Sequence, residues 1–176
     1  ESLATLQAMA AREGVGVVLN ATSFAVASID GSDDEGAQAV TLAGDAPVLQ
    51  LITAGCSLEQ WQDDPHGLAP RDLAMQVVLP EVDGRIGARA ISFKGLAWRC
   101  ERTEVDVVRY QPEPERIAFV AELARRWCVL RSKPQGGKRV ALVLANYPND
   151  DARQANGVGL DTPASTVLIL QALRDA

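Results

Sequence analysis

Short, nearly continuous apolar runs alternate along this chain with segments whose apolar residues recur at helical spacing. A run without polar alternation is typical of a strand covered on both faces of a sheet, and a period near 3.6 is typical of a helix with one buried side. Strands that alternate with helices favour an α/β fold. We therefore predict a mostly parallel sheet with flanking helices, in a Rossmann-like three-layer arrangement. The predicted strands are residues 15–19, 48–52, 89–93, 105–109 and 139–145, of which the last is the most strongly apolar.

The predicted helices are bounded by residues that commonly start or end a helix. The first covers residues 2–12 and ends at Gly14, because glycine often follows a helix terminus. Residues 70–78 form another predicted helix with Pro70 in its first turn, and residues 80–84 are predicted to bend the chain. Further helices are indicated by an apolar stripe after Pro114 and by the cap chemistry of Thr162 and Pro163; the stripe consists of Ile117, Val120, Ala124, Trp127 and Cys128.

A domain boundary is predicted within residues 132–138, where two adjacent glycines interrupt the periodic pattern. We expect residues 1–133 to form an α/β domain. Residues 134–176 are predicted to begin a further α/β unit or to supply the last strand and helix of the same domain. Because the chain begins and stops within apparent helices, we also expect it to be an internal piece of a longer protein.

The composition excludes several classes of function. The net charge of −6 over 176 residues disfavours binding to nucleic acid and to anionic membrane surfaces. No apolar run approaches the roughly 20 residues that a membrane-spanning helix needs. The cysteines are odd in number and widely spaced, which is typical of reduced thiols. We therefore expect a cytoplasmic location.

The glycine-containing loops lack the complete motifs of nucleotide-binding sites. Gly136-Gly137-Lys138 leads into a predicted strand and has no hydroxyl residue after the lysine, so it is not a P-loop. Gly157-Val158-Gly159 has Thr162 where a dinucleotide fingerprint needs its third glycine. Binding of a phosphate or carboxylate at the following helix start remains physically reasonable.

His66 is the single histidine of the sequence, so the chain cannot assemble a Cys/His zinc site by itself. It lies in the turn sequence Asp64-Pro65-His66-Gly67. One interpretation is an ordinary surface turn residue. The other is a general base or a metal ligand that relays the ion within a cleft.

Three long and compositionally unusual stretches carry a resemblance to a known family. They are His66-Gly67-Leu68 with Pro70-Arg71-Asp72-Leu73; Leu79-Pro80-Glu81-Val82-Asp83-Gly84-Arg85-Ile86 with Ala90-Ile91-Ser92-Phe93-Lys94; and Ala145-Asn146-Tyr147-Pro148 continuing through Asn156-Gly157-Val158-Gly159-Leu160-Asp161-Thr162-Pro163. In these stretches the chain resembles an internal piece of the large subunit of aerobic cobaltochelatases. The large subunit of magnesium chelatases is similar, but Arg85 and the Ala-Ile-Ser-Phe-Lys continuation look more like the cobalt enzyme.

The resemblance implies a specific activity. Such subunits bind a tetrapyrrole, hydrogenobyrinic acid a,c-diamide, and insert Co²⁺ as a substrate on the route to cobalamin. ATP and Mg²⁺ are implied to be used by a partner AAA+ ATPase subunit, working with an accessory chelatase subunit. The piece alone is expected to bind no cofactor and to be inactive, because it depends on the remaining domains of its own chain.

Metal insertion also suggests which residues to examine. A dication enters a macrocycle only if inner N–H protons are removed, and a nearby carboxylate can accept them or guide the metal. Glu81 is the predicted catalytic residue, because it lies in a turn between apolar segments where we expect a partly desolvated carboxylate. Asp83 is predicted to cooperate with it. The alternatives are a cap or a salt bridge to Arg85 or Arg89 for Glu81, and a plain turn for Asp83-Gly84.

The remaining candidates are predicted to bind the substrate or the metal. Arg85, Arg89 and Lys94 suit contacts with substrate carboxylates, although a solvated basic face is the alternative. Residues where a strand's carboxyl end meets a helix start are further candidates, because open α/β sheets bind ligands there; a loop held by its own hydrogen bonds is their alternative. These are Asn146, Tyr147, Asn156 and Asp161, and His66 is the candidate metal ligand.

Two other functions remain open at this point. The chain is alternatively a non-catalytic structural or subunit-docking domain of the same large subunit, or of a protein similar to magnesium chelatase. A third possibility is an unrelated ligand-binding α/β module, which the length of the matching stretches disfavours.

Overall fold

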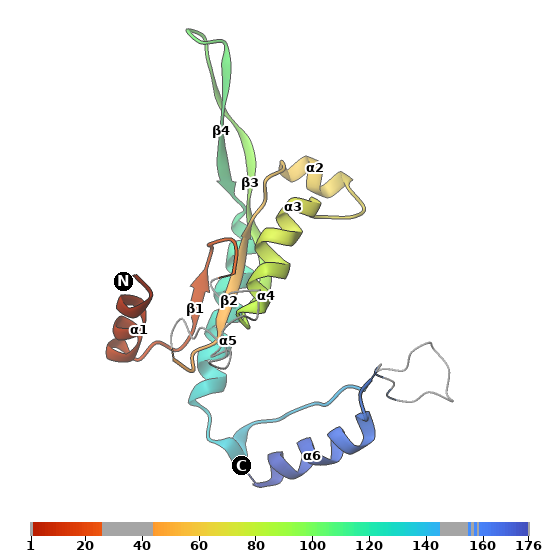
Figure 1. The fold of residues 1–176 in the computed structure, drawn as a ribbon. Coiled ribbons are helices and arrows are strands. Elements are labelled where there is room, and N and C mark those ends of the chain that lie inside the picture. The colour runs from red at the N-terminus through yellow and green to blue at the C-terminus, as the bar shows by residue number, and fades with distance from the viewer. Residues whose placement is uncertain (1, 26–43, 145–154, 156, 158, 176) are drawn as a thin grey trace, which may run out of the picture. The chain divides into compact units, whose positions relative to one another are not determined.

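The computed structural model describes residues 2–25, 44–144, 155, 157 and 159–175, which belong to two compact units (Figure 1). Unit 1 is Glu1–Arg131, and unit 2 is Ser132–Ala176. Unit 1 contains the sheet, and the described part of unit 2 contains one α-helix.

A mixed sheet with the strand order β1-β2-β3-β4 forms the centre of unit 1. Strands β1 (Val18–Asn20), β2 (Val48–Thr53) and β3 (Ile86–Cys100) are parallel, and β4 (Val105–Pro112) is antiparallel to β3. The predicted α/β class is confirmed. The sheet is not parallel throughout, because the turn between β3 and β4 is too short for the crossover that a parallel pair needs. The Rossmann-like three-layer arrangement stays a prediction.

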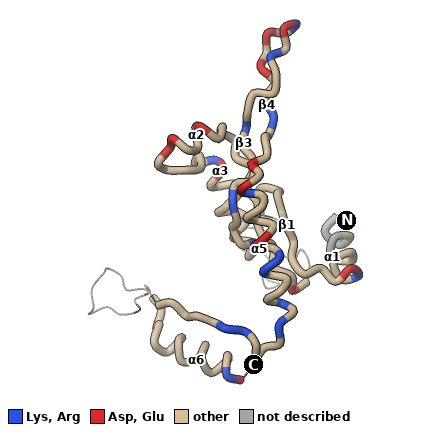
Figure 2. The backbone as a smooth tube through the Cα atoms, turned by 180° about the vertical axis from the view of Figure 1, so that it is seen from behind, with Lys and Arg blue, Asp and Glu red and all other residues tan. Residues whose placement is uncertain are grey.

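The β3–β4 hairpin continues beyond the end of β2 as a two-stranded ribbon (Figure 1). The pairing of β2 with β3 ends at Thr53 and Ser92, whereas the hairpin pairing continues to Cys100 and Val105. Charges of both signs lie near its far end (Figure 2), and Arg99 donates to Asp106 across the ribbon at 2.8 Å. Both strands are longer than the predicted residues 89–93 and 105–109.

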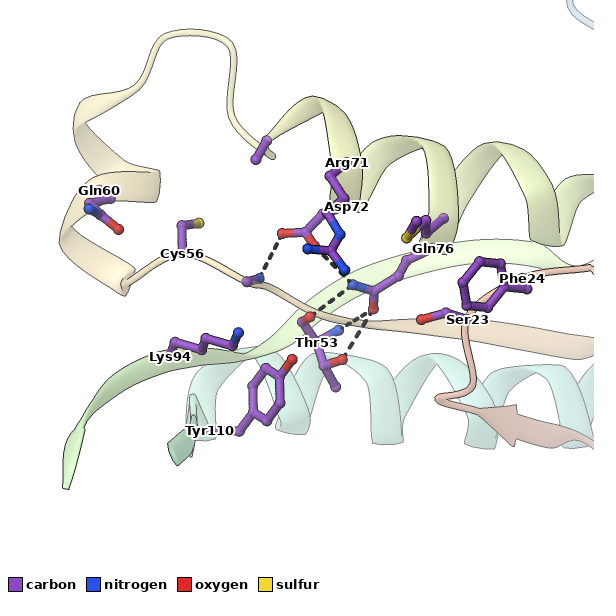
Figure 3. Close-up of a pocket in the computed structure, with 13 residues that line it drawn as sticks. Ser23, Phe24, Thr53, Cys56, Gln60, Arg71, Asp72, Gln76, Lys94 and Tyr110 are labelled. Carbon is purple, nitrogen blue, oxygen red and sulfur yellow. Dashed lines mark hydrogen bonds between the residues drawn. The ribbon is translucent and has the colours of Figure 1, made fainter. Parts of the chain in front are cut away.

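Helices lie on both faces of the sheet (Figure 3). Helices α3 (Pro70–Leu73) and α4 (Leu79–Val82) are joined by a π-helical turn, Ala74–Val78, into a continuous helix, called helix 70–82 below. It covers one face, and α5 (Pro114–Ser132) covers the other with buried Val120 and Ala124. Two further helices are α1 (Ser2–Glu13) and α2 (Leu58–Asp63).

Pro80 lies inside helix 70–82, whereas we predicted that the helix stops at Val78 and that residues 80–84 bend the chain. The π-helical turn makes this possible, since the Leu79 N–H bonds to the Ala74 carbonyl five residues back. Pro80 has no N–H to continue that pattern to Met75. The Met75 carbonyl instead accepts from the Phe24 N–H at 2.9 Å, which ties the segment after β1 to the helix.

The core of unit 1 lies between β2, β3 and helix 70–82. Its buried cluster consists of Ile52, Ala54, Ala90 and Phe93. Trp61 of α2 packs on Phe93 with ring centroids 5.4 Å apart. From the other layer of helices, Arg116 of α5 donates to the Ala90 carbonyl at 2.6 Å, and its guanidinium lies 4.5 Å from the centroid of the Trp61 ring. Both layers of helices are therefore anchored on the central strands.

In unit 2 the predicted strand at residues 139–145 is wrong for 139–144, the part that the structure describes. No strand is assigned there, and Val143 is 86% exposed. Apolar character alone does not make a strand, because the backbone groups need a neighbouring strand, and the described residues of unit 2 supply none. The predicted last helix is confirmed as α6 (Thr162–Asp175).

Truncation of Phe93 tests this core. Phe93→Ala removes a ring that is 2% exposed, and we expect it to lower the free energy of unfolding by about 3–5 kcal/mol. Phe24→Ala is the control, because Phe24 is 54% exposed and its loss should cost about 1 kcal/mol or less. Urea denaturation followed by circular dichroism measures both, and equal losses would contradict the placement of the core.

Candidate functional site

A pocket of about 420 Å³ lies where β1 and β2 end, beside the start of helix 70–82 (Figure 3). Ligands bind at this edge of open α/β sheets. Arg71, Asp72 and Gln76 come from the helix, and Lys94 and Tyr110 come from the hairpin. Cys56, Gln60, Ser23 and Phe24 complete the part of the wall used below.

The buried carboxamide of Gln76 takes the place of a strand at the floor of the pocket. Strand β1 ends opposite Gln50, so the N–H and C=O of Thr53 on that edge have no strand partner. The Gln76 Oε1 accepts from the Thr53 N–H at 2.8 Å, and its Nε2 donates to the Thr53 carbonyl at 2.9 Å. This pair of bonds satisfies both backbone groups and fixes the helix on the strand end.

Asp72 continues this network and is 8% exposed. Its Oδ2 accepts from the Gly55 N–H at 2.7 Å, and its Oδ1 accepts from the Gln76 Nε2 at 3.3 Å. Both carboxylate oxygens are thus engaged by the protein. By contrast, Arg71 and Lys94 form no ion pair with any residue that the structure describes. Lys94 Nζ lies 5.7 Å from the centroid of the Tyr110 ring.

Asp83 and Arg85 form a buried ion pair. Arg85 Nη2 donates to Asp83 Oδ2 at 2.6 Å, and both side chains are 1% exposed. Arg85 Nη1 also donates to Gln50 Oε1 at 3.2 Å and to the Thr22 carbonyl at 3.3 Å. The pair joins the turn before β3 to β2 and to the segment after β1. Both side chains are shielded from solvent, and the contacts of the pair are with other parts of the fold. The predicted catalytic role of Asp83 and the predicted substrate contact of Arg85 stay predictions.

Glu81 is exposed near the end of helix 70–82, so the expected partial desolvation of its carboxylate is wrong for this structure. The backbone around it is nevertheless firmly held. Its carbonyl accepts from the Gly84 N–H at 2.9 Å, and the Pro80 carbonyl accepts from the N–H groups of Asp83 and Arg85. The anticipated salt bridge from Glu81 to Arg85 is absent among the described residues, because Arg85 pairs with Asp83.

Arg89, another predicted substrate contact, faces α5. Its Nη1 lies 3.6 Å from Glu115 Oε1, and its guanidinium lies 3.5 Å from the centroid of the Phe119 ring. Among the predicted substrate residues that the structure describes, Lys94 is the one that lines the pocket.

His66 lies on the surface turn before helix 70–82, with its side chain 90% exposed. Its backbone N–H donates to Asp64 Oδ1 at 2.8 Å, and this bond, with that of the imidazole, lowers the pKa of Asp64. In the described part of the chain, no group of three or more His, Cys, Asp or Glu side chains is arranged to hold a metal ion. The predicted metal role of His66 stays a prediction.

The remaining candidates belong to unit 2. Asp161 caps α6, because its Oδ1 accepts from the Ala164 N–H at 3.0 Å, which is the hydrogen-bonding alternative considered from the sequence. Asn146, Tyr147 and Asn156 lie outside the described residues. Their predicted substrate contacts stay predictions.

Sequence reasoning assigned no role to Arg71, Asp72 or Gln76. Asp72 and Gln76 are four residues apart, and residues at this spacing lie on the same side of a helix. Two polar residues on the inward side of an otherwise apolar helix are a signal of a buried network. Arg71 gave no such signal, since an isolated arginine in a first helical turn is common.

The chain shows clear similarity to known proteins. The model of the CobN/Magnesium Chelatase family matches residues 1–176. The aerobic cobaltochelatase subunit CobN of Pseudomonas aeruginosa is 54% identical over 98% of this chain, and that of a Sinorhizobium species is 48% identical over 98%. The chain spans 13% of the length of each of these relatives.

A solved structure gives the same result. The chain resembles the catalytic subunit of cobaltochelatase from Mycobacterium tuberculosis with a TM-score of 0.69 and 35% identity, over 96% of this chain and 14% of that one.

A separate observation is that no helix in the described parts of the chain has the length and apolarity to span a membrane.

The hypothesis that the buried pair of Asp83 and Arg85 stabilises the fold can be tested by measuring the free energy of unfolding. Arg85→Met leaves the Asp83 carboxylate buried without its cation, and we expect a loss of about 3–5 kcal/mol in the free energy of unfolding. Arg99→Met is the matched control, because it breaks the exposed pair with Asp106 and should cost about 1 kcal/mol or less. A loss for Arg85→Met no larger than that of the control, measured by urea denaturation, would contradict the structural role.

Proposed function

Because this chain belongs to the CobN/magnesium chelatase family, we propose that it forms part of a tetrapyrrole-binding subunit that inserts Co²⁺ into hydrogenobyrinic acid a,c-diamide during aerobic cobalamin biosynthesis. The observation that carries the proposal is the 54% identity to a cobaltochelatase subunit over 98% of the chain. The similarity of the fold to that of a cobaltochelatase catalytic subunit supports it.

The energy source and the partners are part of the same proposal. ATP and Mg²⁺ are used by a partner AAA+ ATPase subunit, which works with an accessory chelatase subunit, and the remaining domains of the same large subunit complete the substrate site. This assignment is supported by the incomplete nucleotide-binding motifs of the sequence. A cytoplasmic location follows from the expectation of reduced thiols, and Cys56, Cys100 and Cys128 are free in the structure.

Glu81 is the proposed proton acceptor. Its carboxylate is exposed, while the turn that follows it is held by backbone hydrogen bonds and by the buried pair of Asp83 and Arg85. A fixed backbone beneath an accessible carboxylate is the arrangement that a positioned general base requires. Asp83 contributes by holding the turn in place.

The chemical step needs no redox change. An inner N–H bond of the macrocycle breaks, and the proton passes to the Glu81 carboxylate. The electron pair left on the nitrogen forms the bond to Co²⁺, which exchanges its water ligands for the ring nitrogens. The protonated carboxyl group then releases its proton to solvent, which its exposure permits.

One observation favours the alternative of a docking domain. The β3–β4 hairpin carries exposed apolar side chains beyond the body of unit 1, among them Leu96 at 59% and Trp98 at 57% exposure. Apolar groups of this size at a protein surface commonly mark contacts with other domains or subunits. A catalytic domain requires Glu81 for cobalt insertion, whereas a docking domain does not.

Replacement of Glu81 separates these functions. In the full-length subunit assayed with its partners, Glu81→Gln removes the proton acceptor and keeps the shape of the side chain. We expect cobalt insertion to fall about 10²–10⁴-fold, the usual contribution of a general base. The rate of appearance of the cobalt-containing product measures the effect.

Glu13→Gln serves as the control for charge, because Glu13 is an exposed glutamate of α1 and lies outside the hairpin. We expect it to insert cobalt at the rate of the unaltered subunit. If Glu81→Gln were as active as this control, Glu81 would have no catalytic role and the docking function would be favoured.

A further inference from the structure

In the described part of the chain, the wall of the pocket at the ends of β1 and β2 carries more cationic than anionic side chains. Asp72 is the single acidic residue among the described residues of its wall, and both of its oxygens accept bonds from Gly55 and Gln76. Arg71 and Lys94 have no carboxylate partner in the described structure. Two cationic side chains of the pocket are therefore available to interact with a bound ligand.

The surrounding groups favour an anion with oxygen acceptors. Helix 70–82 begins at Pro70 beside the pocket, so the positive end of its dipole adds to the two cations. Gln60 uses its Oε1 to accept from the Ser57 N–H at 3.0 Å, which leaves its Nε2 as a donor. A guanidinium, an ammonium and a carboxamide N–H form a set that suits a carboxylate.

The floor of the pocket is built to stay in place while a ligand binds. Gln76 and Asp72 are 5% and 8% exposed, and they bond to backbone groups of β2 and of the residues that follow it. The volume of about 420 Å³ falls in the range of small-molecule sites. These features describe a preformed site rather than a chance gap between surface side chains.

We propose that this pocket binds a peripheral carboxylate of the tetrapyrrole, with Arg71 and Lys94 as its cationic contacts and Gln60 as a further donor. The inference rests on the proposed function, in which the substrate is a partly amidated acid whose rim carries carboxylates. Arg71 and Glu81 lie about 15 Å apart along the axis of helix 70–82. The pocket thus holds the rim of the substrate away from the reacting centre, and it contributes affinity rather than proton transfer.

The test compares two ligands and uses the full-length subunit. The first ligand is hydrogenobyrinic acid a,c-diamide, and the second is the same macrocycle with all its carboxylates amidated. Affinity is measured by quenching of protein fluorescence for the unaltered subunit, Arg71→Gln, Lys94→Gln and the double variant. Arg12→Gln is the matched control, because Arg12 is an exposed arginine of α1 outside the pocket and the hairpin and its loss changes the net charge equally.

We expect each single substitution in the pocket to weaken binding of the acid by about tenfold, the usual effect of losing one hydrogen-bonded charge, and to change binding of the amide by less than twofold. The control should bind both ligands as the unaltered subunit does. Thermal unfolding of each variant checks that it is folded, which we expect because Arg71 and Lys94 are exposed.

Three results would overturn the proposal. Equal losses of affinity for the acid and the amide would mean that the pocket does not recognise the carboxylate. Unchanged affinity for both ligands would remove the tetrapyrrole from the pocket, and weaker association with the partner subunits in these variants would then assign it to a protein carboxylate. If the unaltered subunit bound neither ligand, the proposed function itself would fail.

Discussion

The buried ion pair of Asp83 and Arg85 is the contact on which the arrangement of the proposed catalytic turn depends. With both side chains 1% exposed, the pair has lost its hydration and is stabilised by close contact and by the further bonds of Arg85 to Gln50 and to the Thr22 carbonyl. These bonds connect the turn to β2 and to the segment after β1. The backbone next to Glu81 is therefore held by buried contacts, while the Glu81 side chain is exposed to solvent.

A second set of polar contacts holds the middle of the same helix against the sheet. Gln76 satisfies both backbone groups of Thr53 where β1 has ended, and the Met75 carbonyl, left without a donor by Pro80, accepts from the Phe24 N–H. The proline thus leaves a backbone carbonyl available to the pocket-lining residue Phe24. The irregularity at Pro80 therefore bears on the site, because Phe24 is part of the pocket wall.

The sequence predicted the features that depend on local pattern. Strands β1 to β4 and the helix after Pro114 could be located because their periodicity and boundary residues are local properties. Pairings between distant residues could not be found in this way. Arg85 had several possible acidic partners in sequence, and Pro80 was misjudged because a π-helical turn has no clear sequence signal. Residues 139–144 are apolar without being a strand, since a strand also needs a neighbour. The family resemblance pointed to the end of the helix that carries Glu81 and assigned nothing to Arg71 or Gln76.

Glu81 is the proposed base of the reaction, and a base acts by accepting a proton. The most direct measurement is the single-turnover rate of cobalt insertion as a function of pH, for the unaltered full-length subunit and for Glu81→Gln, each with bound tetrapyrrole. A carboxylate base accepts protons only when ionised, so the rate of the unaltered subunit should fall at low pH. The residual rate of Glu81→Gln should lack that fall. An identical loss of rate at low pH in both proteins would contradict the role of Glu81.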